Sequence, residues 1–284
     1  MNDTLKDISN LFKNKLHGIF EPREINQLYF MVIQNQMHIE RSKILAYPET
    51  KVPNSVNSQI QNIVGRLLNN EPIQYILGET DFYDLIFKVN ESVLIPRPET
   101  EELVHWIITD KQIATSKILD IGTGSGCIAI SLSKNIPDSV VFGLDVSEDA
   151  LNVAKQNAIL NKVATQFIQA DVLSTSYLEL PNHLDVLVSN PPYVMLEEKK
   201  LMKANVLNFE PDLALYVENN KPLVFYIRIA ELGKTLLKIG GKLYFEINEA
   251  LHQQTIAMLE KMGYKHIIAK KDLNDKYRMI RAEL

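Results

Sequence analysis

The segment Ile118-Leu-Asp-Ile-Gly-Thr-Gly-Ser-Gly126 carries the strongest local signal in this chain of 284 residues. A short strand-like run enters three glycines at alternate positions, and a helical pattern begins at about Cys127. Glycine lets the backbone turn sharply and come close to a ligand, and the N–H groups of the following helix attract negative charge. The segment therefore predicts a ligand-binding turn, although a strand-to-helix turn without a ligand would also need glycine.

The glycine spacing separates two classes of cofactor. A dinucleotide fingerprint, G-x-G-x-x-G, beginning at Gly122 would need glycine at position 127, where this chain has cysteine. The spacing is instead G-x-G-x-G preceded by Asp120, which argues against a dinucleotide-dependent reductase. It resembles the first motif of the Rossmann-like S-adenosylmethionine methyltransferases. That resemblance implies that the methionine end of the cofactor is surrounded by Gly122, Thr123, Gly124, Ser125 and Gly126.

Strand and helix patterns alternate along the chain from Lys117 onward. This alternation favours a parallel sheet with helices on both faces. The runs expected to form strands are Ile118–Ile121, Val140–Leu144, Gln166–Gln169, Val186–Ser189 and Lys242–Ile247. Helical patterns cover about Pro98–Ile113, Glu148–Asn161 and Leu223–Ile239.

The first seventy residues have apolar side chains at helical spacing. They predict helices over Leu5–Leu16, from Pro22, over Ile39–Leu45, and after a cap at Asn54 or Ser55. Thr80–Tyr83 and Ile86–Val89 are rich in aromatic and β-branched residues and are expected to form a hairpin. We therefore expect a helical domain at residues 1–72, a β-hairpin linker at 73–95 and an α/β domain at 96–284.

Polar residues stand where successive expected strands end. Asp145 is placed to accept hydrogen bonds from both hydroxyls of a ribose, while Asp171 and Val172 offer a polar group and an apolar shelf for an adenine. Asn190 ends the next strand. Each alone is explained as well by a loop or helix cap. Because ligands of open α/β sheets bind outside the carboxyl ends of the strands, the series predicts a nucleoside-binding edge.

The segment Val188-Ser-Asn-Pro-Pro-Tyr-Val194 carries the most specific chemistry. Prolines lack N–H donors and hold the chain extended, so the carbonyls of Pro191 and Pro192 are free to accept hydrogen bonds. With the side-chain oxygen of Asn190 they can hold a planar NH2 group by its two hydrogens, while Tyr193 covers its face. Such a nitrogen is a poor nucleophile, and fixing it opposite a methyl sulfonium lowers the entropic cost of attack. A proline-stiffened loop without chemistry is the alternative.

This tetrapeptide resembles that of the amino-methyltransferases, which act on glutamine N5 or adenine N6. Several other segments resemble the peptide-chain release factor glutamine methyltransferase family: Pro72–Gly78, Leu94–Glu101, Phe209–Leu215, Gly240–Ile247 and Lys271–Arg278. The resemblance implies methyl transfer from S-adenosyl-L-methionine to the side-chain amide nitrogen (N5) of the glutamine in the Gly-Gly-Gln loop of release factors. It implies an α/β fold, with a Rossmann-like class I methyltransferase domain and a small N-terminal helical domain that contacts the protein substrate.

The resemblance also assigns roles to the site residues. It implies catalytic roles for Asn190, Pro191 and Tyr193, with Pro192 joining them in substrate binding. Cofactor contacts are implied for the residues of the glycine turn and for Asp145, Asp171, Val172 and Asn190. The sequence departs from the family at Asn248 and Asp275, where glycine is common, and at Leu251, where glutamine is common. Arg97 and Glu99 are either ligands or an ordering ion pair.

Composition narrows the possible partners. Thirty Lys and Arg against 35 Asp and Glu give a net charge of −5, which argues against nucleic acid and against the main alternative, an adenine-N6 methyltransferase acting on DNA or RNA. A non-enzymatic adaptor that keeps only the fold is a third interpretation, disfavoured by the complete Asn-Pro-Pro-Tyr segment.

The number of cysteines and the length of the apolar runs indicate in which cellular compartment the protein is expected. The single cysteine, Cys127, cannot form an intramolecular disulfide, and no Cys/His spacing matches a zinc site, so we expect no metal. No run approaches the ~18 apolar residues of a membrane span, and the N-terminus is polar. We therefore expect no membrane partner and a cytoplasmic location.

Overall fold

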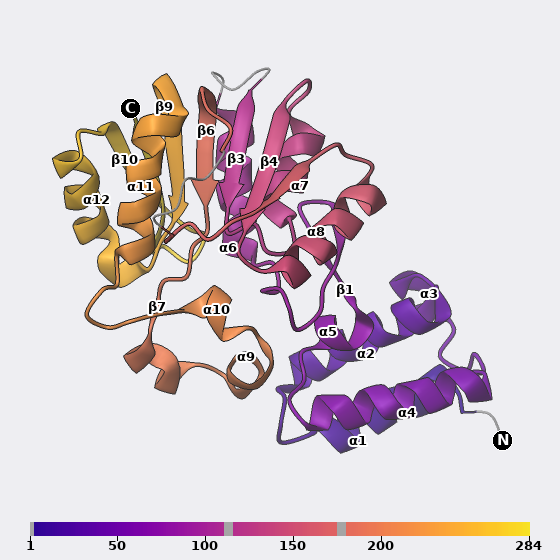
Figure 1. Cartoon of the computed structure of the whole chain (residues 1–284). Coiled ribbons are helices and arrows are strands. Elements are labelled where there is room, and N and C mark those ends of the chain that lie inside the picture. The colour runs from indigo at the N-terminus through magenta and orange to yellow at the C-terminus, as the bar shows by residue number, and fades with distance from the viewer. Residues whose placement is uncertain (1–2, 111–115, 175–179) are drawn as a thin grey trace. The chain divides into compact units, whose positions relative to one another are not determined.

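The computed structural model describes residues 3–110, 116–174 and 180–284 and divides into two compact units. The helical unit comprises the chain up to Gly78 together with Lys203–Phe209. The α/β unit comprises Glu79–Met202 and Glu210–Leu284. Figure 1 shows both units, with most of the helices and several of the strands labelled.

The helical unit is built on one apolar cluster. Leu5, Ile8, Phe12 and Leu16 of the first helix are buried at helical spacing, as predicted, and a capping box of Thr4 and Asp7 begins that helix. The fourth helix starts one residue earlier than expected, because extended Pro53 takes the N-cap position and no side chain caps it. The predicted helices are α1 (Leu5–Leu16), α2 (Pro22–Met37), α3 (Arg41–Ala46) and α4 (Asn54–Leu68). Two further helices, α5 (Ile73–Leu77) and α9 (Ala204–Phe209), were not predicted.

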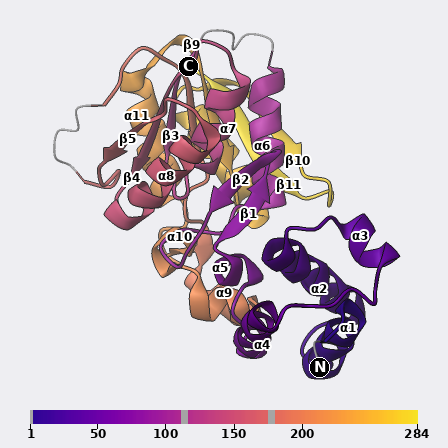
Figure 2. The ribbon, with the colours of Figure 1, turned by 90° about the vertical axis from the view of Figure 1, so that its right-hand side faces the viewer.

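The predicted hairpin is confirmed. Strands β1 (Glu79–Phe82) and β2 (Leu85–Lys88) pair antiparallel, and Tyr83 and Asp84 turn between them with φ of 49° and 59° (Figure 2). Two residues with positive φ form the tight turn whose twist suits a hairpin. Buried Asn157 accepts from the backbone N–H of Lys88 at 2.7 Å and donates to the Lys88 carbonyl at 3.0 Å. Asn157 lies on helix α8 (Glu148–Asn161), so the hairpin is held against that helix.

Seven strands form the central sheet in the order β10-β11-β9-β6-β3-β4-β5. Figure 1 labels β10, β9, β6, β3 and β4 of this sheet. The five predicted strands are confirmed and run parallel to one another. The other two strands, β10 and β11, were not predicted, and β11 pairs antiparallel with both β10 and β9. The sheet is therefore mixed rather than wholly parallel. The strands are β3 (Lys117–Ile121), β4 (Val140–Asp145), β5 (Gln166–Gln169), β6 (Leu184–Ser189), β9 (Leu237–Glu246), β10 (Lys265–Lys271) and β11 (Tyr277–Glu283).

Helices cover both faces of this sheet, and each face has its own apolar core. One core packs the sheet against α6 (Pro98–Thr109), α7 (Cys127–Asn135) and α8 (Glu148–Asn161). The other packs it against α11 (Val224–Leu236) and α12 (His252–Lys261), which lie beside β9 and β10 in Figure 1. Helix α6 ends before the predicted Ile113, which lies outside the described residues.

Short strands and helices follow the segment at the carboxyl end of β6. Strand β7 (Val194–Met195), directly after the Asn-Pro-Pro-Tyr segment, pairs in parallel with β8 (Tyr216–Val217). The two short strands thereby join that segment to α10 (Asp212–Leu215). Two 3-10 helices complete the unit, η1 (Leu196–Leu201) and η2 (Glu249–Leu251).

Candidate active site

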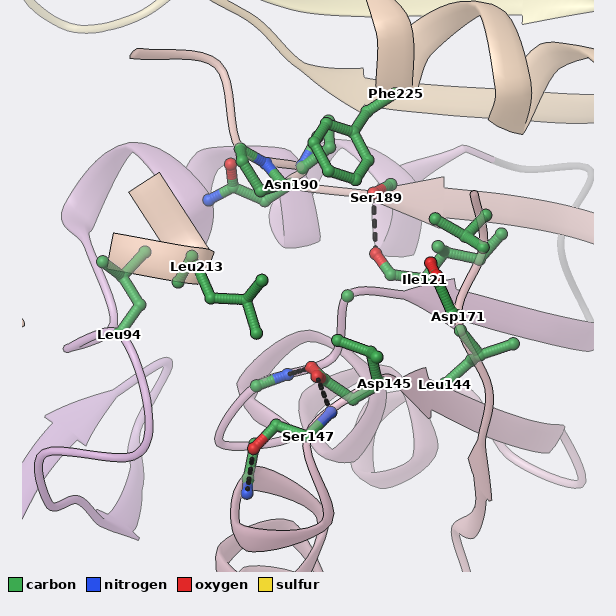
Figure 3. A pocket seen from close by; sticks show the side chains of 18 of the residues that line it. Leu94, Ile121, Leu144, Asp145, Ser147, Asp171, Ser189, Asn190, Leu213 and Phe225 are labelled. Carbon is green, nitrogen blue, oxygen red and sulfur yellow. Dashed lines mark hydrogen bonds between the residues drawn. The ribbon is translucent and has the colours of Figure 1, made fainter. Parts of the chain in front are cut away.

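A cavity of about 400 Å³ opens at the carboxyl ends of β3, β4 and β6 (Figure 3). Its volume falls in the range of small-molecule sites, and most of its wall is apolar. In Figure 3 Asn190 lies across the cavity from Asp145 and Ser147, with Leu94 and Leu213 to one side. The cavity therefore occupies the sheet edge that the sequence predicts.

Eight of the twelve predicted site residues line this cavity. They are Gly122, Gly124, Asp145, Asp171, Val172, Asn190, Pro191 and Pro192. The other four, Thr123, Ser125, Gly126 and Tyr193, are not among its lining residues. Each of these four instead supports a neighbouring segment, as the contacts below describe.

Gly122 and Gly124 adopt the left-handed conformation, with φ of 73° and 53°. A Cβ on either would meet no protein atom within 4 Å, so a side chain there would enter the open space that the two glycines line. The N–H groups of Gly122 and Thr123 both donate to the Leu144 carbonyl, at 2.8 and 2.9 Å. The turn is therefore held against the end of β4 and presents bare backbone to the cavity.

Gly126 has a packing role. Its φ is 81°, and a Cβ would lie 2.8 Å from Ile130 Cδ1 and 3.2 Å from Ala154 Cβ. Helix α7 begins at the next residue, so glycine here lets α7 approach α8 closely. The last glycine of a dinucleotide-binding turn has the same helix-packing role, whereas the role predicted for Gly126 was a cofactor contact.

Buried hydrogen bonds of Thr123 and Ser125 hold the glycine turn in place. The buried Thr123 hydroxyl donates to Asp120 Oδ2 at 2.6 Å, and burial raises the pKa of the Asp120 carboxyl to about 7. The Ser125 carbonyl accepts from Asn157 Nδ2 at 2.9 Å. Because Asn157 also holds Lys88, one buried amide joins the glycine turn to the β1–β2 hairpin.

Asp145 lies at the end of β4 with both carboxylate oxygens on backbone donors. Oδ2 accepts from the N–H of Gly124 at 2.8 Å and Oδ1 from that of Ser147 at 3.0 Å. Burial raises the pKa of Asp145, and these N–H groups act against that rise. Each oxygen keeps a second lone pair. The side chain is therefore oriented and can still accept from two ribose hydroxyls.

Asp171 and Val172 form another part of the wall. Val172 is buried in the core and also lines the cavity, as an apolar shelf would. Asp171 is exposed, and its Oδ1 accepts from the Leu173 N–H at 2.9 Å. The Arg228 Nε donates to the Val172 carbonyl at 2.9 Å and holds this loop against α11.

The Asn-Pro-Pro-Tyr segment is tethered at both ends. Asn190 Nδ2 donates to Thr100 Oγ1 at 3.2 Å, and the Tyr193 hydroxyl donates to Glu246 Oε1 at 3.1 Å. Burial raises the pKa of Tyr193 far above its usual value and that of Glu246 to about 6. The Tyr193 ring packs against the core beneath α11 and α12. That this ring covers a substrate amide stays a prediction.

Sequence reasoning missed several side chains that complete the site. Thr100 lies within the Leu94–Glu101 segment, and Glu246 lies within the predicted strand Lys242–Ile247. Their positions were therefore noted, but their contact with each other was not predicted. Leu94 and Leu213, which line the cavity, lie in the Leu94–Glu101 and Phe209–Leu215 segments, but nothing in the sequence indicated that they reach the cavity. Asn248 was noted only as a departure, yet its Nδ2 donates to the Tyr193 carbonyl at 3.2 Å.

Arg97 forms an ion pair with a partner that the sequence did not indicate. Its guanidinium pairs with Glu210 at 2.5 Å rather than with Glu99, and the Glu210 side chain is fully buried. The same carboxylate accepts from the Ile95 N–H at 3.3 Å, so the pair orders the loop before α6. Asp275 has φ of 63°, a conformation that glycine adopts without strain, which explains why glycine suits that position.

Two properties of the described residues concern other classes of site. No group of three or more His, Cys, Asp or Glu among them could hold a metal ion. Within the same ranges, no helix is both long enough and apolar enough to cross a membrane.

The chain is similar to known methyltransferases in sequence and in fold. The chain matches the PrmC N-terminal domain family over residues 17–78 and the Methyltransferase small domain family over 100–208. A methyltransferase from Pyrococcus furiosus shares the fold, with a TM-score of 0.51 and 17% identity over 78% of this chain and 98% of that one. The release factor glutamine methyltransferase of Flavobacterium psychrophilum is 46% identical, covering 98% of both chains. That of Bacteroides thetaiotaomicron is 43% identical, over 97% of this chain and 98% of its own. This chain therefore belongs to the release factor glutamine methyltransferase family of S-adenosylmethionine-dependent enzymes.

Proposed function

We propose that this enzyme transfers a methyl group from S-adenosyl-L-methionine to the side-chain amide nitrogen of the glutamine in the Gly-Gly-Gln loop of peptide-chain release factors. The observation that carries the proposal is a tethered Asn190, followed by two prolines, on the wall of a cavity whose opposite wall holds Asp145. The names of its relatives, at 43–46% identity over nearly the whole chain, support the same activity.

The residues present fit S-adenosyl-L-methionine. Gly122 and Gly124 leave room that any side chain would fill, which suits the methionine end. Asp145 has lone pairs for the ribose hydroxyls, while Asp171 and Val172 suit the edge and face of the adenine. When bound, the cofactor supplies a methyl group on a positively charged sulfur, which is reactive towards weak nucleophiles.

The rim residues then hold the glutamine side chain. Asn190 Oδ1 and the Pro191 carbonyl accept the two amide hydrogens, and Pro192 keeps the segment extended. Holding both hydrogens fixes the plane of the amide and directs its nitrogen at the methyl carbon, which lowers the entropic cost of attack. A proton leaves the nitrogen after transfer, so no strong base is needed beforehand.

The helical unit, in this proposal, supplies the contact with the release factor. A single glutamine side chain offers far less surface than the about 800 Å² per partner of a specific protein interface. A cytoplasmic location is part of this proposal, because a chain with a single cysteine has no intramolecular disulfide of the kind that is common in secreted proteins.

The test is a radiolabelled methyl transfer from the cofactor to purified release factor. We expect label on the glutamine of the Gly-Gly-Gln peptide, located by mass spectrometry, and none on a factor whose glutamine is replaced by alanine. Parallel reactions contain duplex DNA or RNA. An unlabelled release factor, with the enzyme folded and cofactor bound, would refute the proposal, and label on nucleic acid would favour an adenine-N6 enzyme.

Asn248→Ala tests whether the departure from glycine at this position supports the site. The side chain donates to the Tyr193 carbonyl and to Glu198 Oε2, at 3.2 and 3.0 Å, and caps η2 by accepting from Ala250. We expect the free energy of unfolding to fall by about 1–2 kcal/mol, as for a lost cap and buried hydrogen bond. Because the Tyr193 loop loosens, kcat should also fall about 3- to 10-fold.

Denaturant unfolding and steady-state kinetics measure the two effects. The exposed Asn152 on α8 provides a matched Asn→Ala control that should change neither. A destabilised Asn248→Ala enzyme with wild-type kcat would show that Asn248 stabilises the fold without positioning the loop.

A further inference from the structure

A relay of two hydrogen bonds connects the amide of Asn190 to a buried carboxylate. Asn190 Nδ2 donates to Thr100 Oγ1 at 3.2 Å, and the Thr100 hydroxyl donates to Glu246 Oε2 at 2.7 Å. Thr100 is 2% exposed and Glu246 1%, so bulk water does not reach either partner. The relay joins α6, the end of β9 and the loop after β6, three places far apart in the sequence.

The chemistry of the three groups allows one orientation of the amide. A carboxylate only accepts hydrogen bonds, and a hydroxyl has one proton to donate. Burial raises the pKa of Glu246 to about 6, which is still below neutral pH, so the carboxylate is ionised there. It therefore accepts the hydrogen bond from the Thr100 hydroxyl. The Thr100 oxygen is then left as an acceptor, so the end of Asn190 that faces it must be the NH2 group.

We infer that Thr100 and Glu246 are positioning residues that set which end of the Asn190 amide is offered to the substrate. The inference rests on the proposed function, in which Asn190 Oδ1 accepts a hydrogen from the glutamine NH2. With Nδ2 taken by Thr100, Oδ1 is the end left for the substrate. In the reverse orientation the NH2 group of Asn190 would face the NH2 group of the glutamine. Both groups are donors, so the glutamine would lose one of its two hydrogen bonds.

The same carboxylate also fixes the far end of the segment. Glu246 Oε1 accepts from the Tyr193 hydroxyl at 3.1 Å, while Oε2 accepts from Thr100. One buried group therefore holds Asn190 and Tyr193 together, and with them the Pro191 carbonyl between. Glu246 therefore helps to keep Asn190 Oδ1 and the Pro191 carbonyl at a fixed distance from each other. This spacing matters because a misplacement of about 1 Å at a reacting centre lowers the rate greatly.

Thr100→Val removes the hydroxyl and keeps the shape of the side chain. We expect kcat on release factor to fall about 10- to 100-fold, as when one fixed polar contact to the reacting group is lost. The KM for the cofactor and the affinity for S-adenosylhomocysteine, measured by calorimetry, should stay within about twofold, because Thr100 is not a cavity-lining residue. Thr100→Ser restores the hydroxyl and should return kcat to within a few-fold of wild type.

A matched control and a second variant keep the test decisive. Thr255→Val replaces another fully buried threonine, whose hydroxyl donates to the Leu251 carbonyl, and should leave kcat unchanged. Glu246→Gln keeps the volume but can donate to the Thr100 oxygen, which frees the hydroxyl to turn to Asn190. It should lower kcat at least about tenfold and decides the matter if Thr100→Val does not fold.

The outcomes separate this inference from the proposed function. Wild-type methylation of glutamine together with full kcat in the folded Thr100→Val enzyme, or in Glu246→Gln where it is needed, overturns the inference alone. A Thr100→Ser enzyme as slow as Thr100→Val also overturns it. A wild-type enzyme that binds cofactor but leaves the glutamine unmethylated refutes the proposed function and the inference with it.

Discussion

Asn190→Ala should reduce kcat on release factor by at least about 1,000-fold while the affinity for S-adenosyl-L-methionine changes by no more than a few-fold. In the proposed mechanism, the substitution removes the side-chain oxygen that holds one amide hydrogen, and the weak nucleophile is no longer oriented. Fixed polar groups and alignment at a reacting centre are worth this much in rate. In the proposed mechanism, binding of the cofactor depends mainly on other residues of the cavity wall, among them Gly122, Gly124 and Asp145.

Single-turnover methylation and calorimetry with the cofactor measure the two quantities separately. Asn152→Ala, on the exposed side of α8, is the matched control and should behave like wild type. If cofactor affinity falls as far as the rate does, Asn190 belongs to the cofactor site rather than to the amide-holding rim.

Asp145→Ala should show the opposite division. We expect the apparent KM for the cofactor to rise about 10- to 100-fold, with a smaller fall in the rate at saturating cofactor. Hydrogen bonds to a charged group contribute about 1.5–3 kcal/mol, which corresponds to that change in affinity. The loss includes the carboxylate's hold on the N–H groups of Gly124 and Ser147, which shape the glycine turn.

Asp145→Asn is the graded variant for this test. It keeps one acceptor oxygen, so its KM should fall between those of wild type and Asp145→Ala in a titration of initial rate against cofactor. A rate at saturation that falls more than the KM rises would place Asp145 in the methyl-transfer step itself.

The part of the site made by residues at the carboxyl ends of the strands could be predicted from the sequence. A parallel strand brings the residue after it to one edge of the sheet, so Asp145, Asp171 and Asn190 could be placed together from the apolar runs before them. The glycine turn was predictable because glycine spacing reports backbone conformation. These inferences are local: each needs only a strand and the residue that follows it.

The remaining parts depend on contacts between distant segments. Thr100, Asn190 and Glu246 meet through hydrogen bonds that span 90 and 146 positions, and no local pattern reports such a pairing. The partner of Arg97 was missed for the same reason, since Glu210 is 113 positions away. Strands β10 and β11 were missed because lysines and arginines interrupt their apolar positions near the sheet edge.

A crystal structure of this enzyme with S-adenosylhomocysteine and a release factor measures the central claim most directly. We expect the glutamine amide to donate its two hydrogens to Asn190 Oδ1 and the Pro191 carbonyl, with its nitrogen facing the cofactor sulfur along an open path. A glutamine held by other groups, or an Asn190 that turns its NH2 group to the amide, would contradict the mechanism derived from this site.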